Sequence, residues 1–215
     1  MKRFVPLMLV AAALTGRAEI IDRIAASVLE QVVTLSDVRR QIRLSAYLEK
    51  TPVDFSEENL RRTTALLVDQ MLVRREAELS RYPAPSYKEV EDTLSQLGLS
   101  LGESKEKLLA SALEYGFSEQ EVREQAAWRL TLVRFIDYRF RPGVQVSEAD
   151  AARYYNDVFA PQFRRRTPGA EPPALNLVHD RIVEILNTQL ATEAAQLWLE
   201  QARRQTKIHY FEEAF

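Results

Sequence analysis

The sequence predicts a mainly α-helical protein with a small β element, and three observations carry this prediction. A serine followed three residues later by a carboxylate recurs before segments with a regular apolar pattern, which is typical of helix starts. From Ser36 onward apolar residues follow the helical period of 3.6 almost without interruption. The segment from Ile20 to Leu35 is instead rich in β-branched residues, and Lys207 to Phe211 is predicted to be a terminal strand.

The N-terminus resembles a secretory signal peptide. Basic Met1-Lys2-Arg3 precedes an apolar run from Phe4 to Leu14, and Gly16 and Ala18 form a small-x-small cleavage site. The run is shorter than the roughly 20 residues of a bilayer-spanning helix, although an uncleaved anchor is the alternative. The chain has no cysteine, so an oxidising compartment does not affect it. We therefore predict a cleaved signal peptide at residues 1–18 and a periplasmic protein.

The charge of the remaining chain excludes one class of partner. The full chain has 29 basic and 31 acidic residues, and the signal segment carries three of the basic ones, so about −5 remains after cleavage. Nucleic-acid binding depends on concentrated positive charge, and we predict no such partner. Residues 19–215 are predicted to form one soluble domain, with no stable membrane insertion after cleavage.

The first element after the signal segment is predicted to be a short hairpin. Ile24, Ala26 and Val28 alternate along Ile20 to Leu35, as in a strand with one buried face. The turn is expected near Leu29-Glu30-Gln31, which contains none of the Gly, Asn or Asp residues that tight turns prefer. The register is therefore open, and a helix over part of this stretch is the alternative.

Helices are predicted over most of the remaining chain. Capping boxes begin at Ser86, Ser100, Ser118 and Ser147. The expected helices are Asp37 to Glu49, Glu57 to Arg81, Tyr87 to Leu97, Glu103 to Tyr115, Glu119 to Phe140, Glu148 to Phe159 and Asn176 to Gln205. Arg164 to Ala174 is predicted to be a loop, and its three arginines are either an anion-binding patch or simply exposed.

The sequence contains no recognisable catalytic constellation. His179 and His209 lie far apart, and neither has a carboxylate or second histidine at ligand spacing. Phosphate-binding, dinucleotide-binding and zinc-protease motifs are absent from the sequence. We predict no catalytic residue, no metal and no cofactor.

Two of the predicted helices, those that begin at Glu57 and at Glu119, are apolar on more than one face. In the helix from Glu119, Trp128, Leu132 and Phe135 form a second stripe beside the main apolar stripe. A doubly apolar helix is either packed on both sides or keeps one stripe as a binding surface. The candidate peptide-binding residues are this second stripe together with Met71, whose flexible side chain suits varied partners.

Several segments, in order, resemble the N-terminal chaperone domain of SurA-like periplasmic proteins. They are DRIAASV, VVTLSDV, LLVDQMLVRREAELSRY, SYKEVEDTLSQLG and FSEQEVREQAAWRLTLVRFIDYRFRPGVQVSEADAARYYND. The last segment, IVEILNTQLATEAAQLWLEQARRQTKIHYF, is similar to the helix and strand that complete that domain. The resemblance covers Glu19 to Phe211 and implies a multi-helix domain in which the C-terminal strand joins the N-terminal hairpin.

The resemblance also implies a function. In that family, parvulin-type prolyl isomerase domains are usually inserted after the helix that holds Tyr154-Tyr155, whereas this chain has the eleven residues Arg164 to Ala174 there. The implied protein is an ATP-independent chaperone for unfolded polypeptides, such as outer-membrane proteins in transit, without isomerase activity. The alternatives are a scaffolding subunit that binds one folded partner, and a prolyl isomerase. A homodimer formed by segment swapping is also open.

Overall fold

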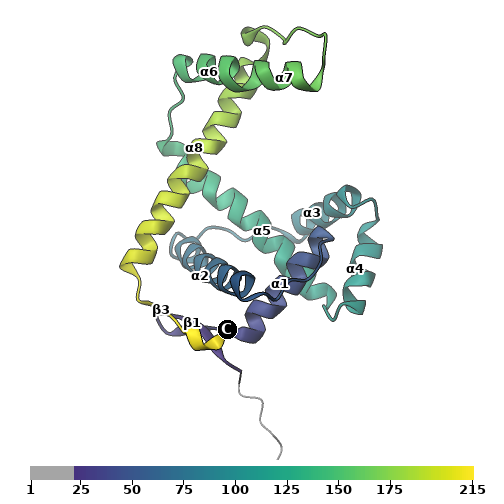
Figure 1. The fold of residues 1–215 in the computed structure, drawn as a ribbon, viewed down its shortest axis with the longest axis vertical. Coiled ribbons are helices and arrows are strands. Elements are labelled where there is room, and N and C mark those ends of the chain that lie inside the picture. The colour runs from purple at the N-terminus through teal and green to yellow at the C-terminus, as the bar shows by residue number, and fades with distance from the viewer. Residues whose placement is uncertain (1–21) are drawn as a thin grey trace, which may run out of the picture.

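The computed structural model describes residues 22–215 and confirms a mainly helical fold with a small antiparallel sheet (Figure 1). The predicted signal peptide, residues 1–18, lies outside the described residues. The elements are β1 (Ile24–Val28), β2 (Gln31–Thr34), α1 (Leu35–Glu49), α2 (Glu57–Leu79), α3 (Tyr87–Ser100), α4 (Lys105–Glu114), α5 (Glu119–Phe140), α6 (Glu148–Tyr154), α7 (Ala160–Arg166), α8 (Leu175–Gln205) and β3 (Ile208–Tyr210). Within residues 22–215, no helix combines the length and the apolarity that crossing a membrane requires.

The sheet joins the two ends of the described chain. Its strand order is β2-β1-β3, and both pairs are antiparallel. Val28 pairs with Gln31 across a two-residue turn, and it also pairs with Ile208 of β3. The predicted hairpin and the pairing of the C-terminal strand with it are therefore confirmed, and β3 pairs with β1 of its own chain.

Side-chain caps fix where the helices begin. The capping boxes predicted at Ser86, Ser118 and Ser147 are present, each with its carboxylate three residues further on. The box predicted at Ser100 is wrong, because α3 continues through that residue and Ser104 caps α4 instead. Thr34 forms a further capping box at the start of α1. Reciprocal caps satisfy amides that lack a partner in the first helical turn, which explains these starts.

Two apolar cores share α1. Val38 and Ile42 in its first half pack with the sheet and with α2. Leu44, Tyr47 and Leu48 in its second half pack with α3, α4 and the start of α5. One helix whose two halves face different cores holds the sheet and the α3–α5 group in a fixed relation.

Helix α8 runs from the far end of the molecule back to the sheet (Figure 1). It packs against α5 and α2, and Phe140 of α5 contacts Trp198 of α8 with ring centroids 5.9 Å apart. Arg203 of α8 binds Asp69 of α2 through both carboxylate oxygens, with 2.6 Å between Nε and Oδ1. These contacts place β3 beside β1.

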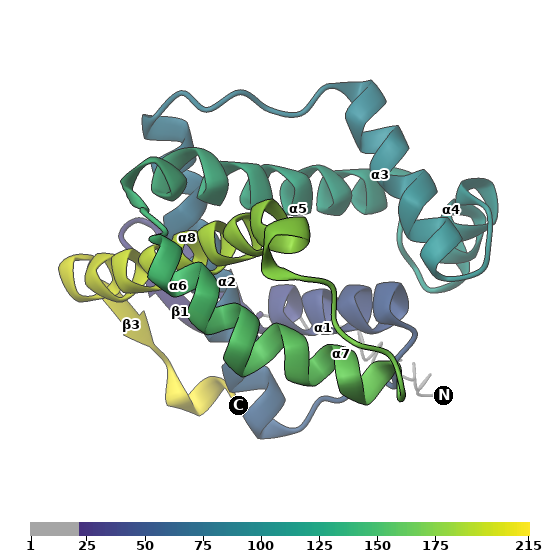
Figure 2. The ribbon, with the colours of Figure 1, turned by 90° about the horizontal axis from the view of Figure 1, so that it is seen from above.

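An arm made of α6, α7 and the first part of α8 extends from the end opposite the sheet (Figure 1), and Figure 2 shows from above that α6 and α7 follow one another end to end. Between α6 and α7 the helix continues through a π-helical segment, Tyr155–Phe159. The predicted loop limits are therefore wrong at one end: Arg164 to Arg166 are helical, and only residues 167–174 connect α7 to α8. Basic side chains in the last turn favour helix continuation, because they complement the helix dipole.

Candidate functional site

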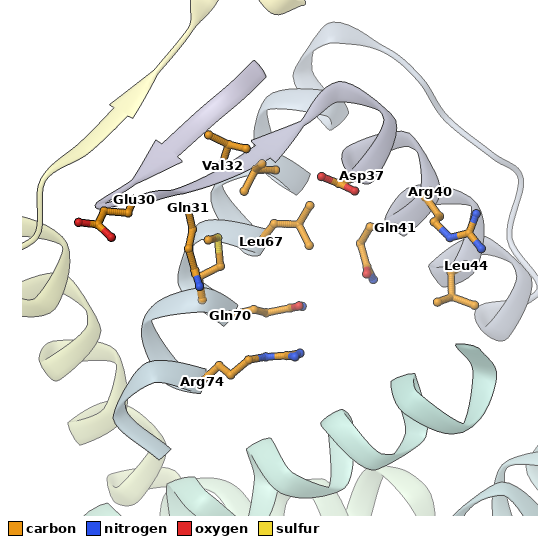
Figure 3. A pocket seen from close by; sticks show the side chains of 12 residues that line it. Glu30, Gln31, Val32, Asp37, Arg40, Gln41, Leu44, Leu67, Gln70 and Arg74 are labelled. Atoms are coloured by element: carbon orange, nitrogen blue, oxygen red, sulfur yellow. The ribbon is translucent and has the colours of Figure 1, made fainter. Parts of the chain in front are cut away.

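A large hollow in the described chain opens beside β2. It is a cleft of about 750 Å³ between β2, α1 and α2. In Figure 3, Gln41 extends from α1 and faces Leu67 and Gln70 on α2. Leu67 and Met71 pack on the first core with part of their surface uncovered, which gives the cleft an apolar floor. Gln41 and Gln70 add amide groups that both donate and accept hydrogen bonds.

A second cleft adjoins the first around the tip of the hairpin. Its volume is about 720 Å³, and it lies between the hairpin tip, the second half of α2 and Lys207. Four residues line both clefts: Glu30, Gln31, Met71 and Arg74. The two hollows therefore adjoin, and together they follow α2 from Leu67 to Glu78, which is about 16 Å of helix. We call the two hollows together the α2 groove.

Leu29 at the hairpin tip adopts an unusual backbone conformation. Its φ is 55°, in the left-handed region that disfavours residues with a Cβ atom. Its amide donates to the carbonyl of Lys207 over 3.0 Å, which attaches the tip to the linker before β3. The side chain is 47% exposed and lines the α2 groove. A strained residue that presents an exposed leucine to a groove makes Leu29 a candidate binding residue.

Two arginines connect the walls of the groove to α5. The Arg74 guanidinium lies 4.6 Å from the ring centroid of Trp128, and Arg40 forms an ion pair with Glu121 and lies over the Phe117 ring. Trp128 is only 9% exposed, and its indole Nε1 has no hydrogen-bond partner. Arg74 therefore separates Trp128 from the groove.

Salt bridges at Glu91 fix the position of α5. This α3 carboxylate accepts from Lys105 of α4 over 2.8 Å and from Arg123 of α5 over 2.9 Å. These two bonds hold the pKa of Glu91 below its usual value, with Lys105 the larger cause. The carboxylate is thus charged at neutral pH and links α3, α4 and α5.

The structure places the four predicted binding residues in different surroundings. Met71 lines the α2 groove. Trp128 lies behind Arg74, and Leu132 is half-buried. Phe135 has no exposed surface and packs edge-on against Tyr82, with ring centroids 5.4 Å apart. Phe135 therefore belongs to the interior, and Trp128, Leu132 and Phe135 do not form one open stripe.

Several residues that line the α2 groove were not among the predicted binding residues. They are the hairpin-tip residue Leu29, Val32 of β2, and Gln41 and Gln70 of the facing helices. The sequence carried one signal for Leu29, since an apolar residue occupied a turn without Gly, Asn or Asp. The two glutamines carried none, because polar residues on helices are ordinarily solvated.

The two histidines lie outside the groove lining. His179 contacts Glu148 over 3.0 Å and Asp180 over 3.2 Å, and His209 packs on Phe211. Among residues 22–215, no group of three or more His, Cys, Asp or Glu side chains is arranged to hold a metal ion. No model of a known protein family matches the chain, and no curated protein matches its sequence.

Proposed function

We propose that the protein is an ATP-independent periplasmic chaperone that binds unfolded polypeptides in the α2 groove, with outer-membrane proteins in transit as its clients. The observation that carries the proposal is the groove itself: it is open, it follows α2, and it combines an apolar floor of Leu67 and Met71 with amide and guanidinium donors. Such a surface suits varied polypeptides better than one small ligand. The SurA-like order of segments and the signal-like N-terminus support the compartment and the client class.

The balance of free energies favours reversible holding. Burial of about 400 Å² of apolar surface, counting groove and client together, contributes roughly 10 kcal/mol. Ordering of a flexible client and loss of its free motion remove several kcal/mol. An affinity near micromolar, about −8 kcal/mol, allows capture and spontaneous release without ATP.

The short connection between α7 and α8 supports holding without isomerase catalysis. It spans residues 167–174, whereas a mixed α/β isomerase domain needs many times that length. Tyr155 donates to the carbonyl of Pro173 over 2.9 Å, so this connection lies along the arm. In a proline-limited peptide assay we expect no acceleration by the protein, and clear catalysis would overturn this part of the proposal.

A light-scattering assay tests the proposed site. A urea-unfolded porin is diluted into buffer with the wild type or with Gln41→Glu/Gln70→Glu. Both substituted side chains are half-buried in the groove, and a client that covers them would strip water from two new carboxylates. We expect equal protection to require at least roughly tenfold more of the variant, equivalent to about 1.4 kcal/mol.

Gln189→Glu/Gln196→Glu is the matched control. Both of its positions are exposed on α8 outside the groove lining, and the change in net charge is the same. We expect this variant to protect the porin as well as the wild type does. If the two double variants protect equally, the α2 groove is not the binding site. A wild type that leaves porin aggregation unchanged would refute the chaperone function.

A further inference from the structure

We propose that the α2 groove holds its client as an added β-strand, hydrogen-bonded to the outer edge of β2. This inference rests on the proposed function and deepens it, because it names the conformation and the chemistry of the bound segment. The occupant is an extended, uncharged polypeptide segment with apolar side chains at alternate positions.

No strand covers the outer edge of β2 in the described structure, although the Thr34 N–H donates to Asp37 in the α1 capping box over 2.9 Å. The strand order β2-β1-β3 places β2 at one edge, and no strand among residues 22–215 pairs with its outer side. In a two-residue hairpin the closing pair, here Val28 and Gln31, exchanges its backbone hydrogen bonds, and alternate residues point theirs outward. The N–H and C=O of Val32 therefore face away from β1. Its side chain is 50% exposed.

The groove follows this edge rather than one face of the sheet. Successive side chains of a strand point to opposite faces, so a cleft over one face would be lined by alternate residues. Four consecutive residues, Glu30 to Val33, line the cleft instead. In Figure 3, β2 lies along one side of the cleft, across from Leu67 and Gln70 of α2. A strand added to β2 would thus have α2 beneath it.

The lining selects the chemistry of that strand. Leu67 and Met71 offer apolar contacts to the side chains that point toward α2. The charged lining residues of this cleft cancel, with Glu30 and Asp37 against Arg40 and Arg74. The part of the groove beside β2 therefore carries no net charge, and the whole α2 groove, to which the second cleft adds Arg75, Glu78 and Lys207, carries a single positive charge. β2 has four residues, Gln31–Thr34, so an added strand would pair with it over about four extended residues.

The outward-facing backbone N–H of Val32 gives the sharpest test of the added strand. Val32→Pro removes the outward N–H and leaves the ladder to β1 intact, since proline is tolerated where a strand's N–H faces solvent. Val32→Thr is the matched control, because it keeps the N–H and a β-branched side chain. Binding of a fluorescein-labelled nine-residue peptide of alternating valine and serine is measured by anisotropy. We expect about 3- to 10-fold weaker binding for Val32→Pro and less than a twofold change for Val32→Thr.

A second measurement does not depend on the folding of any variant. Single backbone N-methyl groups are moved along the peptide, and wild-type affinity is measured at each position. An added strand bonds to β2 through every second residue, so we expect affinity losses that alternate with a period of two. Equal losses at all positions, or equal affinity of Val32→Pro and Val32→Thr, would overturn the inference.

Other outcomes separate the inference from the proposed function. A wild type that protects the porin but does not bind the peptide would refute strand addition and leave the chaperone function standing. A wild type that does neither would refute both. A dimer in sedimentation experiments that Val32→Pro dissociates would show that a second copy occupies the edge, and this would also overturn the inference.

Discussion

Replacement of Leu29 by asparagine should weaken client binding without lowering the stability of the protein. Leu29 has a φ of 55°, and the left-handed conformation costs an ordinary residue about 1–2 kcal/mol, whereas asparagine adopts it more readily. Full burial of a leucine contributes about 1.5–3 kcal/mol, and this side chain is 47% exposed, so its loss costs about 1 kcal/mol. We expect the free energy of unfolding to stay unchanged or to rise by up to about 1 kcal/mol.

Client binding by the Leu29→Asn variant should become weaker, although its stability does not fall. The half-exposed leucine contributes apolar surface to the second cleft of the α2 groove, at the hairpin tip. Its loss should weaken protection of an unfolded porin by roughly fivefold, which is about 1 kcal/mol. Urea unfolding followed by circular dichroism gives the stability, and light scattering gives the protection.

Arg81→Asn provides the control for strain alone. Arg81 also has a left-handed backbone, with a φ of 51°, but its side chain is exposed and lies outside the groove lining. This variant should gain stability and protect the porin normally. A loss of more than about 1 kcal/mol in Leu29→Asn would show that Leu29 is a core residue. Unchanged stability with unchanged protection would refute the binding role.

Three further predictions concern the interior and two surface carboxylate networks. Phe135→Ala should lower the free energy of unfolding by about 3–5 kcal/mol in urea titrations. Trp128→Phe should change it by less than about 1 kcal/mol, because it removes an indole donor that has no acceptor. Equal losses of stability in the two variants would contradict the assigned burial. Ser86, and then Arg134, lower the pKa of Glu89 from 4.5 to about 2, so its stabilising contribution is complete above pH 4.5 and is lost as pH falls toward 2. The difference in melting temperature between the wild type and Glu89→Gln should therefore shrink across that window, and a constant difference would refute the assignment. Asp180 and Glu148 raise the pKa of His179 above 6.5, so the contribution of His179 to stability is present below pH 6.5 and is lost as pH rises through the raised pKa. NMR titration of the His179 ring should give a midpoint above 6.5. A lower midpoint would exclude these contacts in solution.

Local signals in the sequence predicted most of the helical elements. Ser86, Ser118 and Ser147 each have a carboxylate three residues later, and each starts a helix where expected. Ser100 shows the limit of such signals, since it also has this spacing but lies inside α3. A hydroxyl and a carboxylate at the right spacing can cap a helix only if the preceding helix has ended there. Where one helix ends depends on its packing as much as on local preference.

The candidate binding site was predicted less well than the fold. Periodicity placed Phe135 and Trp128 on a second apolar stripe of one helix, but it does not distinguish a stripe that faces solvent from one that faces another helix. Tyr82 covers Phe135, and Arg74 covers Trp128. Both covering residues belong to segments about fifty residues away in sequence, so no local pattern predicts these contacts. Met71 lines the α2 groove because α2 has an apolar face that is only partly covered, and its role in binding stays a prediction.

The sequence by itself determined the helical character, the N-terminal hairpin, the terminal strand and most helix starts. These features follow from interactions among residues a few positions apart, such as caps, apolar periodicity and β-branched alternation. Only the tertiary structure decided that β3 joins β1 rather than β2 of the hairpin, that no strand covers the outer edge of β2 and that a groove lies between that edge and α2. A groove depends on where separate elements fail to fill the space between them. Packing between distant segments sets that outcome, and local sequence does not encode it.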